Sequence, residues 1–256
     1  MKKTNLLISC FLLCICSFAQ KAKKEEEKIY LLDENYKGAT LETAKYFIRV
    51  AKRNDTCWQF DTYNIYGPLI SSERYKDEKG EVLHGQSVFY NNLGTRDSIC
   101  NFYNGFADGP FYFLNDTGKI YLQKDFSKGI LVGTTDRIKK DSIEAAIQQQ
   151  KKDTVKYVEV ESSFAGGDKG WARYLQANLV YPDRAQKIPK QGSVVVQFIV
   201  DTEGRVSDLE IVKSVEFSLD EETLRIIKES PRWTPAMQNG KKVKSYKKQP
   251  LSFKLQ

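Results

Sequence analysis

The alternation of apolar and polar positions changes character twice along this chain of 256 residues. Residues 46–133 show short runs of period two with little helical periodicity, which predicts strands joined by tight turns. From residue 163 onward, helical and strand periods alternate, which predicts a compact unit. The pattern therefore predicts an α+β protein: an N-terminal antiparallel sheet, the polar linker 134–162, and a C-terminal domain of helices and strands.

Turn glycines in the first region recur every 24 residues. Gly85, Gly109 and Gly133 follow this interval, and Gly94 and Gly118 repeat it. Such a unit supplies two strands and two turns, and it covers its apolar face only by joining its neighbours in one sheet. The pattern resembles the MORN-like repeats of bacterial envelope proteins, and an ordinary β-meander is the alternative. The aromatic residues expected to be buried are Tyr90, Phe102, Phe113 and Phe126.

Two helices are predicted in the C-terminal region. Trp171 and Tyr174 lie at helical spacing, and Pro182 closes that segment. Ser218 is followed three positions later by Glu221, a pairing typical of a capping box at the start of a helix. The residues expected on the buried stripe of this second helix are Leu219, Leu224 and Ile227.

Three strands are predicted to form an antiparallel sheet with these helices. Residues 194–200 alternate apolar and polar positions, residues 202–204 make a turn, and residues 208–212 form the second strand of a hairpin. The third strand runs from about Lys244 to Leu255. The side chains expected to be buried behind it are Leu251, Phe253 and Leu255, with Trp233 closing the core.

Pro250 lies inside the last predicted strand. Proline has no N–H to give to a ladder and is tolerated at the edge of a sheet. The strand is therefore expected to keep one flank open, with lysines that discourage indiscriminate pairing. An open flank is also the geometry by which an extended peptide adds to a sheet as a further strand.

The motifs from residue 164 to the end of the sequence, taken in order, resemble the C-terminal domain of TonB in the form common in Bacteroidetes-type bacteria. They are FAGG at 164–167, YP at 181–182, GSVVVQFIVDTEGRVSDLEIVKS at 192–214, LDEETLRIIKESPRWTPAMQNGKKV at 219–243 and PLSFKL at 250–255. Two positions depart from that pattern: Ala165 replaces a proline, and Val180 replaces a polar residue. The resemblance implies a three-stranded antiparallel sheet packed by two helices.

The resemblance also implies a function. Domains of this kind bind the TonB box, a short peptide of outer-membrane receptors that import iron complexes, vitamins or glycans. The box pairs with the last strand and touches the segment before Tyr-Pro. The positions that this implies for partner binding are Asn178, Leu179, Val180, Tyr181, Lys244, Tyr246, Lys248, Pro250 and Ser252.

The first twenty residues predict a secretory signal. A basic start precedes an apolar run from Leu6 to Phe18, and Ser17 and Ala19 occupy the small positions before a cleavage site. A run of roughly 14 apolar residues is shorter than the roughly 20 that a spanning helix needs. We therefore expect a periplasmic protein with a cleaved signal. The alternatives are a retained inner-membrane anchor, as in a true energy transducer, and acylation at Cys10.

The expected organisation has five segments. They are a signal peptide at 1–20, a charged leader at 21–45, the β-repeat domain at 46–133, a linker with a short helix at 134–162, and the TonB-like domain at 163–256. Cleavage would lower the net charge from +7 to +5. The lysines near the C-terminus are expected either to solvate a sheet edge or to contact acidic protein or cell-wall polymer. Two chains exchanging terminal strands is a further option.

No catalytic or metal-binding pattern is recognised. Cys57 and His84 form no nucleophilic motif, and one histidine with two distant cysteines makes no zinc site. Residues 165–170, AGGDKG, lack the Lys-Ser/Thr of a phosphate loop and read as a loop leading into a helix. Cys57 and Cys100 remain after cleavage, either as a disulfide or as two free thiols. We expect a protein-binding function without enzyme activity, cofactor or nucleic acid.

Overall fold

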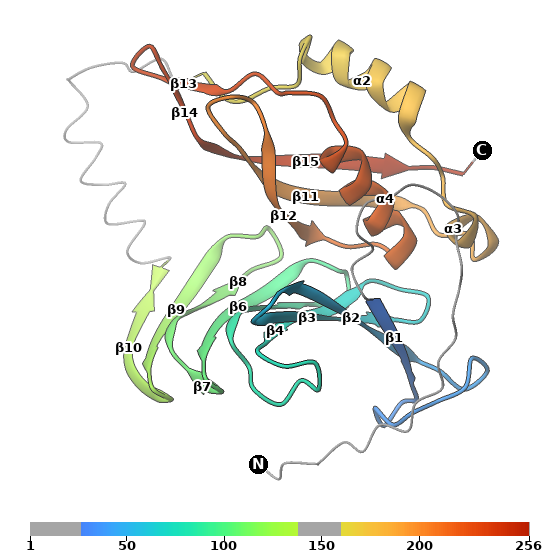
Figure 1. The fold of residues 1–256 in the computed structure, drawn as a ribbon, viewed down its shortest axis with the longest axis vertical. Helices are drawn as coiled ribbons and strands as arrows, with labels where there is room; N and C mark the ends of the chain where they lie inside the picture. The colour runs from blue at the N-terminus through green and yellow to red at the C-terminus, as the bar shows by residue number, and fades with distance from the viewer. Residues whose placement is uncertain (1–26, 138–159, 256) are drawn as a thin grey trace. The chain divides into compact units, whose positions relative to one another are not determined.

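The computed structural model describes residues 27–137 and 160–255. The chain divides into two compact units, Met1–Asp141 and Ser142–Gln256. Figure 1 shows the strands and helices of each unit. The predicted signal peptide, the first six residues of the charged leader and the helix expected in the linker lie outside the described residues.

The first unit is one antiparallel sheet, as predicted (Figure 1). Among the described residues its strands follow the order β1-β2-β3-β4-β5-β6-β8-β9-β10, and β7 pairs with β6. Their bounds are β1 Glu27–Leu32, β2 Tyr46–Asn54, β3 Cys57–Asn64, β4 Leu69–Tyr75, β5 Gly85–Tyr90, β6 Arg96–Tyr103, β7 Phe106–Ala107, β8 Gly109–Leu114, β9 Ile120–Ser127 and β10 Ile130–Asp136. Apart from β7 and β8, which both pair with β6, strands adjacent in sequence are neighbours in the sheet, so its pairing is local.

The sheet begins earlier than the sequence pattern indicated. β1 pairs with β2 from Glu27 opposite Ala51 to Leu32 opposite Tyr46. Leu32 is 2% exposed, so part of the predicted charged leader belongs to the folded sheet. The charges that precede Ile29 obscured a short strand, because edge strands carry such charges more readily than central ones.

The 24-residue spacing corresponds to repeated backbone geometry. Gly94 and Gly118 have φ of 73° and 76°, a left-handed conformation that glycine adopts without steric cost. In both turns the Oδ1 of an asparagine, Asn91 or Asn115, accepts a hydrogen bond at 3.0 Å from the backbone N–H four residues later. The sequence period therefore encodes the same hairpin turn twice.

The aromatic residues of the repeat are less buried than expected. Tyr90 is buried, as predicted, whereas Phe102, Phe113 and Phe126 are half-buried. The ring of Phe111 lies 5.4 Å from that of Phe102 and 4.6 Å from that of Phe126, measured between centroids. A row of aromatic rings thus crosses neighbouring strands on one face of the sheet.

An ion pair is buried in the same sheet. Arg49 on β2 donates to the Oδ2 of Asp61 on β3 at 2.7 Å, and Gln59 donates to both Asp61 and Ser72. Burial by itself raises the pKa of Asp61. The charge of Arg49 and the hydrogen bonds from its neighbours outweigh this effect and hold the pKa below its ordinary value.

The second unit has a three-stranded antiparallel sheet with the order β12-β11-β15, and helices pack against it (Figure 1). The strands are β11 Gly192–Val200, β12 Val206–Lys213 and β15 Ser245–Phe253. The helices are α2 Gly167–Asn178, α3 Asp183–Lys187 and α4 Phe217–Lys228, and a separate hairpin consists of β13 Ala236–Gln238 and β14 Lys241–Val243. The α+β class predicted from the sequence is confirmed.

The core of this unit lies between the sheet and α4. The predicted inward positions of β11 are completely buried, and so are Leu219, Ile226 and Ile227 of α4. The ring of Trp233 is 3% exposed and lies 5.0 Å from that of Phe198 between centroids. Trp233 therefore closes the core as expected.

Four details of this unit differ from the expectation. Leu224, predicted on the buried stripe of α4, is half-buried, and Ile226 is buried instead. The capping box at Ser218 is wrong, because α4 begins at Phe217 and its cap is Glu216, whose side chain accepts from the Ser218 N–H. Leu255 lies beyond the last strand and is 37% exposed rather than buried. The short helix α3 was not predicted, because its five residues are too few to show a helical period.

Candidate functional site

β15 lies at the edge of its sheet. Its ladder with β11 runs without a shift from Gly192 opposite Phe253 to Val200 opposite Ser245. The order β12-β11-β15 ends there. Among the residues that the structure describes, no other strand pairs with β15, and no backbone hydrogen bond outside the ladders involves residues 245–253. Its second flank is therefore open within the described part of the chain.

The position of Pro250 indicates which backbone groups face this open flank. Pro250 lies opposite Val195 in an unbroken ladder. A proline fits such a ladder where its nitrogen faces away from the partner strand. Because the orientation alternates along a strand, we infer that the N–H groups of Tyr246, Lys248 and Ser252 face the open flank.

The side chains of β15 alternate in the same way. Leu251 and Phe253 are 1% and 2% exposed and face the core. Tyr246 is 71% exposed, and Lys248 and Ser252 are exposed on the opposite face. The residues whose N–H groups face the open flank thus present their side chains to solvent.

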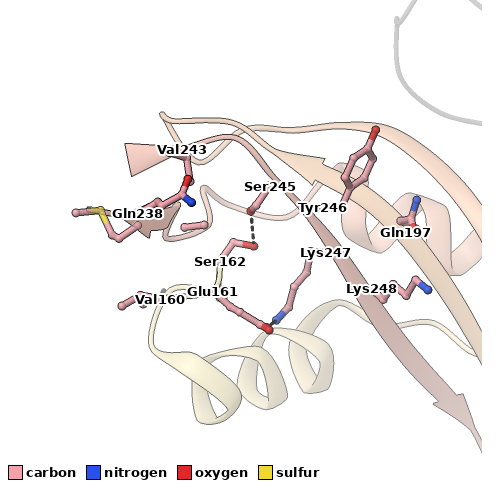
Figure 2. A pocket seen from close by; sticks show the side chains of 12 residues that line it. Val160, Glu161, Ser162, Gln197, Gln238, Val243, Ser245, Tyr246, Lys247 and Lys248 are labelled. Carbon is pink, nitrogen blue, oxygen red and sulfur yellow. Dashed lines mark hydrogen bonds and ion pairs between the residues drawn. The ribbon is translucent and has the colours of Figure 1, made fainter. Parts of the chain in front are cut away.

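A groove of about 490 Å³ lies beside the first half of β15 (Figure 2). Its wall includes the segment 160–162, which sequence reasoning assigned to the linker. The Oγ of Ser245 donates to that of Ser162 at 3.1 Å, and the Nζ of Lys247 lies 3.6 Å from a carboxylate oxygen of Glu161. The other lining residues are Gln197, Ala236, Met237, Gln238, Val243, Tyr246 and Lys248.

Main-chain hydrogen bonds hold this wall in place. Val160 and Met237 exchange N–H···O bonds of 3.1 and 2.8 Å, and Ser163 and Thr234 exchange bonds of 3.0 and 2.7 Å. Ser162 is 1% exposed. The wall is therefore fixed before any ligand arrives.

The groove favours an acidic ligand. Glu161 is the acidic residue among those that line it, and its side chain is 89% exposed. Lys247 contributes a positive charge beside it, whereas the side chain of Lys248 alternates to the opposite face of β15. A ligand carboxylate can replace the exposed Glu161 beside Lys247 at little cost, because surface ion pairs contribute at most about 1 kcal/mol.

The segment from Asn178 to Tyr181 lies near the other end of β15. The ring of Tyr181 meets that of Phe253 edge to face, with centroids 5.7 Å apart. Val180 is 60% exposed, while its N–H donates to the buried carboxylate of Glu222 on α4 at 2.7 Å. This end of the edge is thus rigid in its backbone and apolar at its surface.

An ion pair on α4 holds the segment 178–181 in place. Glu222 accepts two hydrogen bonds of 2.7 Å from Arg225, and Arg225 donates to the carbonyl of Asn178 at 2.8 Å. The hydrogen bonds and charge of Glu222 raise the pKa of Arg225, which stays protonated. The predicted contact residues 178–181 are therefore anchored to α4.

The structure distributes the predicted contact residues along one edge. Tyr246 and Lys248 line the groove, with Lys244 just before the strand, Pro250 and Ser252 in its second half, and residues 178–181 near its end. Nine strand residues span about 30 Å. The sequence analysis did not predict the groove residues Glu161, Ser162 and Gln197, because no motif marks them. It also missed the β13–β14 hairpin, although Asn239-Gly240 is a turn signal.

The other sequence candidates do not converge on a site. Cys57 and Cys100 are free thiols on β3 and β6. Two strands lie between them, which separates them by roughly 14 Å, so the disulfide alternative is not formed. His84 accepts from the N–H of Asn104 at 3.4 Å in a turn. No group of three metal-ligating side chains occurs among the described residues.

The segment AGGDKG begins α2, because its last four residues, 167–170, form the first turn of that helix. Gly166 caps the helix with φ of 81°, and a Cβ at Gly170 would lie 2.1 Å from the carbonyl oxygen of Ala165. These glycines are needed for a tight turn in which the chain packs on itself. Within residues 27–137 and 160–255, no helix is long and apolar enough to cross a membrane.

Comparison with known proteins finds a family match within the second unit. Residues 177–255 match the family model described as Gram-negative bacterial TonB protein C-terminal. The match begins near the end of α2 and includes β15 and the anchored segment 178–181. It supports a TonB-like role linked to TonB-dependent transport, in which such domains interact with other proteins such as outer-membrane receptors. No curated protein matches the chain.

Proposed function

We propose that residues 160–255 form a peptide-binding module that captures an extended segment of an outer-membrane transport protein, or of another envelope partner, by strand addition along β15. The observation that supports this most strongly is the open flank of β15. The backbone of Tyr246, Lys248 and Ser252 can give hydrogen bonds there without any change in the sheet.

The energetics of this edge suit a short peptide. Each main-chain hydrogen bond contributes about 0.5–1.5 kcal/mol net, so several along one strand give useful affinity for any extended sequence. Choice among sequences then comes from side chains. The groove beside Lys247 selects an acidic residue, and Val180 offers an apolar contact near the other end.

The TonB box of an outer-membrane receptor is the occupant that the family match favours. The proposed role is one of binding, with no enzyme activity and no cofactor. The antiparallel sheet of the first unit, β1 to β10, is called the repeat sheet, and we interpret it as MORN-like. It serves as a second interaction surface. The chain acts in the periplasm after its signal peptide is removed.

A true energy transducer is the second candidate. The matching family model is described by the name of the TonB protein, and the apolar run Leu6–Phe18 would have to remain as an inner-membrane anchor. The N-terminus of the protein from cell envelopes distinguishes the two. A start near Gln20 supports the exported module, and an intact N-terminus in the inner-membrane fraction supports the transducer.

The binding mode is tested with one position on β15. Ser252→Pro removes an N–H from the open flank, whereas Ser252→Ala removes the hydroxyl and keeps the N–H. The probe is a synthetic peptide with the TonB box of an outer-membrane receptor, titrated into the full chain by calorimetry. We expect Ser252→Pro to weaken binding about tenfold or more, and Ser252→Ala to bind like the wild type.

Circular dichroism and tryptophan fluorescence confirm that both variants are folded. Equal binding by the wild type and Ser252→Pro would exclude strand addition at this flank. A loss of binding in both variants would mean that the peptide contacts the side chain of Ser252 and not its backbone N–H.

A further inference from the structure

A short stretch of extended backbone, residues 179–181, joins α2 to α3. Leu179, which follows α2, has φ of −74° and ψ of 128°, and Pro182, which precedes α3, has φ of −66° and ψ of 137°. Tyr181 stands before a proline, a position that also favours extended dihedral angles. Among the strands that the structure describes, none pairs with residues 179–181. This stretch is therefore extended but belongs to no sheet.

The middle N–H of this stretch is held by α4. Val180 donates to the Oε1 of Glu222 at 2.7 Å. In extended backbone, the N–H and C=O groups of successive residues point to opposite sides. The N–H of Tyr181 and the C=O of Leu179 therefore point away from Glu222. Neither group has a hydrogen-bond partner within residues 27–137 and 160–255.

The carboxylate of Glu222 is itself fixed in direction. It is buried, and Arg225 donates to each of its two oxygens at 2.7 Å, a bidentate arrangement that sets orientation as well as distance. Arg225 also donates to the C=O of Asn178 at 2.8 Å. Two hydrogen bonds from α4 thus hold the chain here, one just before the stretch and one in its middle.

The bond between Val180 and Glu222 orients the backbone and does not merely satisfy a buried donor. Val180 is 60% exposed, so water can reach this part of the chain and accept from its N–H in place of Glu222. Without Glu222, the peptide planes on either side of Val180 are free to rotate. The contribution of Glu222 is therefore the direction in which the unbonded groups of Leu179 and Tyr181 point.

We propose that Glu222 is a positioning residue for the peptide-binding edge. It turns the N–H of Tyr181 and the C=O of Leu179 toward the ligand, and both groups bond the main chain of the bound peptide. One residue of an extended ligand can make both bonds, as in a parallel ladder. Binding does not have to order these groups, because Glu222 orients them beforehand.

The inference rests on the proposed function and adds a second main-chain contact to the one along β15. The two contacts are neighbours, because the ring of Tyr181 meets that of Phe253, the last residue of β15, with centroids 5.7 Å apart. A peptide that follows β15 to this end therefore reaches residues 179–181.

The test is a binding cycle in the full chain, measured by calorimetry. The probes are a synthetic peptide with the TonB box of an outer-membrane receptor and two shortened peptides, each truncated at one end. Glu222→Ala removes the acceptor of the Val180 N–H, and Glu222→Gln keeps the size of the side chain and one oxygen. Glu229→Ala is the matched control, because Glu229 also pairs with Arg225, at 2.6 Å, but from its exposed side.

We expect Glu222→Ala to weaken the full peptide about fivefold to tenfold, the effect of one or two main-chain hydrogen bonds. The peptide that is shortened at the end near residues 179–181 should bind Glu222→Ala and the wild type equally. Glu222→Gln should lose less affinity than Glu222→Ala, and Glu229→Ala should bind like the wild type. Hydrogen exchange of the Val180 N–H should be faster in Glu222→Ala, with β15 unchanged.

The shortened peptides separate positioning from general damage to the fold. An equal loss for all three peptides in Glu222→Ala would mean that Glu222 only stabilises the domain, and would overturn the inference. Wild-type affinity in Glu222→Ala, or the same loss in Glu229→Ala, would also overturn it. A wild-type chain that binds none of the peptides would instead overturn the proposed function. Circular dichroism shows whether each variant is folded, and Glu222→Gln gives the same comparison of peptides if Glu222→Ala is not.

Discussion

The two units of this chain are stabilised by different kinds of interaction. In the repeat sheet, each strand pairs with a neighbour in sequence, and polar side chains such as Arg49, Asp61 and Ser87 are buried among the strands. In the second unit, β11 pairs with β15, which follows it at a long sequence distance, and apolar side chains around Phe198 and Trp233 fill a core beside which Glu216 and Asp220 are also buried. The first unit thus depends on local contacts, and the second depends on one shared core.

This difference predicts how damage spreads. In a sheet built from repeats, each repeat contacts only its neighbouring repeats, so a weakened repeat opens locally. In a domain with a single core, the loss of one central side chain weakens every element that packs on it. Matched variants within one unit, and one pair of variants across the two units, test this contrast.

The largest effect is expected at the buried ion pair of the repeat sheet. Asp61→Asn leaves the charge of Arg49 buried without a counter-charge, which typically costs about 3–5 kcal/mol. Asp55→Asn is the control, because Asp55 pairs with Lys52 at 3.4 Å in full contact with solvent. Its loss should cost less than about 1 kcal/mol. Urea unfolding measures the free energy of unfolding of each variant, and hydrogen exchange shows which unit is affected.

The same pair gives the repeat sheet a pH dependence. The pKa of Asp61 is lowered in the folded state, so the unfolded chain binds the proton more tightly. The stabilisation is complete above the unfolded value of about 3.9 and is lost as the pH falls through the folded value. Asp61→Asn should lack this part of the acid sensitivity. A wild type and a variant with parallel stability curves between pH 2 and 5 would contradict this assignment.

The second largest loss of stability is expected at a buried residue of β15. Leu251→Ala removes a side chain that is 1% exposed and should cost about 2–5 kcal/mol. Tyr246→Ala, on the same strand, removes one that is 71% exposed and should change stability by less than about 0.5 kcal/mol. Hydrogen exchange should show faster opening of α4 as well as β15 in Leu251→Ala. Faster exchange confined to β15 would mean that this core is less cooperative than we infer.

The architecture of both units could be predicted because it follows from short-range patterns. The glycine period predicted the repeated turns, and the alternation around Phe198 predicted the buried strand. Pro250 predicted an edge strand, and the sheet order places β15 at that edge. In each case a single residue type had a physical consequence that does not depend on distant parts of the chain.

The features that the sequence did not reveal depend on distant partners. Glu216 caps α4 instead of Ser218, because its carboxylate is buried and bonded to Arg184. The groove wall at Glu161 and Ser162 exists because that segment pairs beside Thr234 and Met237. No local pattern marks such contacts, so they cannot be placed from the sequence alone.

The smallest change in stability is expected at a turn that occurs with the same hydrogen bonds in both units. Asn115 and Asp201 each accept hydrogen bonds from the N–H groups two and four residues later, and the glycines that follow, Gly118 and Gly204, have φ of 76° and 81°. A Cβ at Gly118 meets nothing within 4 Å, whereas one at Gly204 lies 2.0 Å from the carbonyl oxygen of Trp233.

Gly118→Ala should therefore cost only the left-handed strain, about 1–2 kcal/mol. Gly204→Ala should cost that strain and a further amount of about 1–3 kcal/mol, because the backbone of Trp233 must move. Thermal unfolding of the two variants gives the difference directly. Equal losses would mean that the turn, and not the core behind it, limits stability in the second unit, and the contrast between local and shared contacts would not hold at this position.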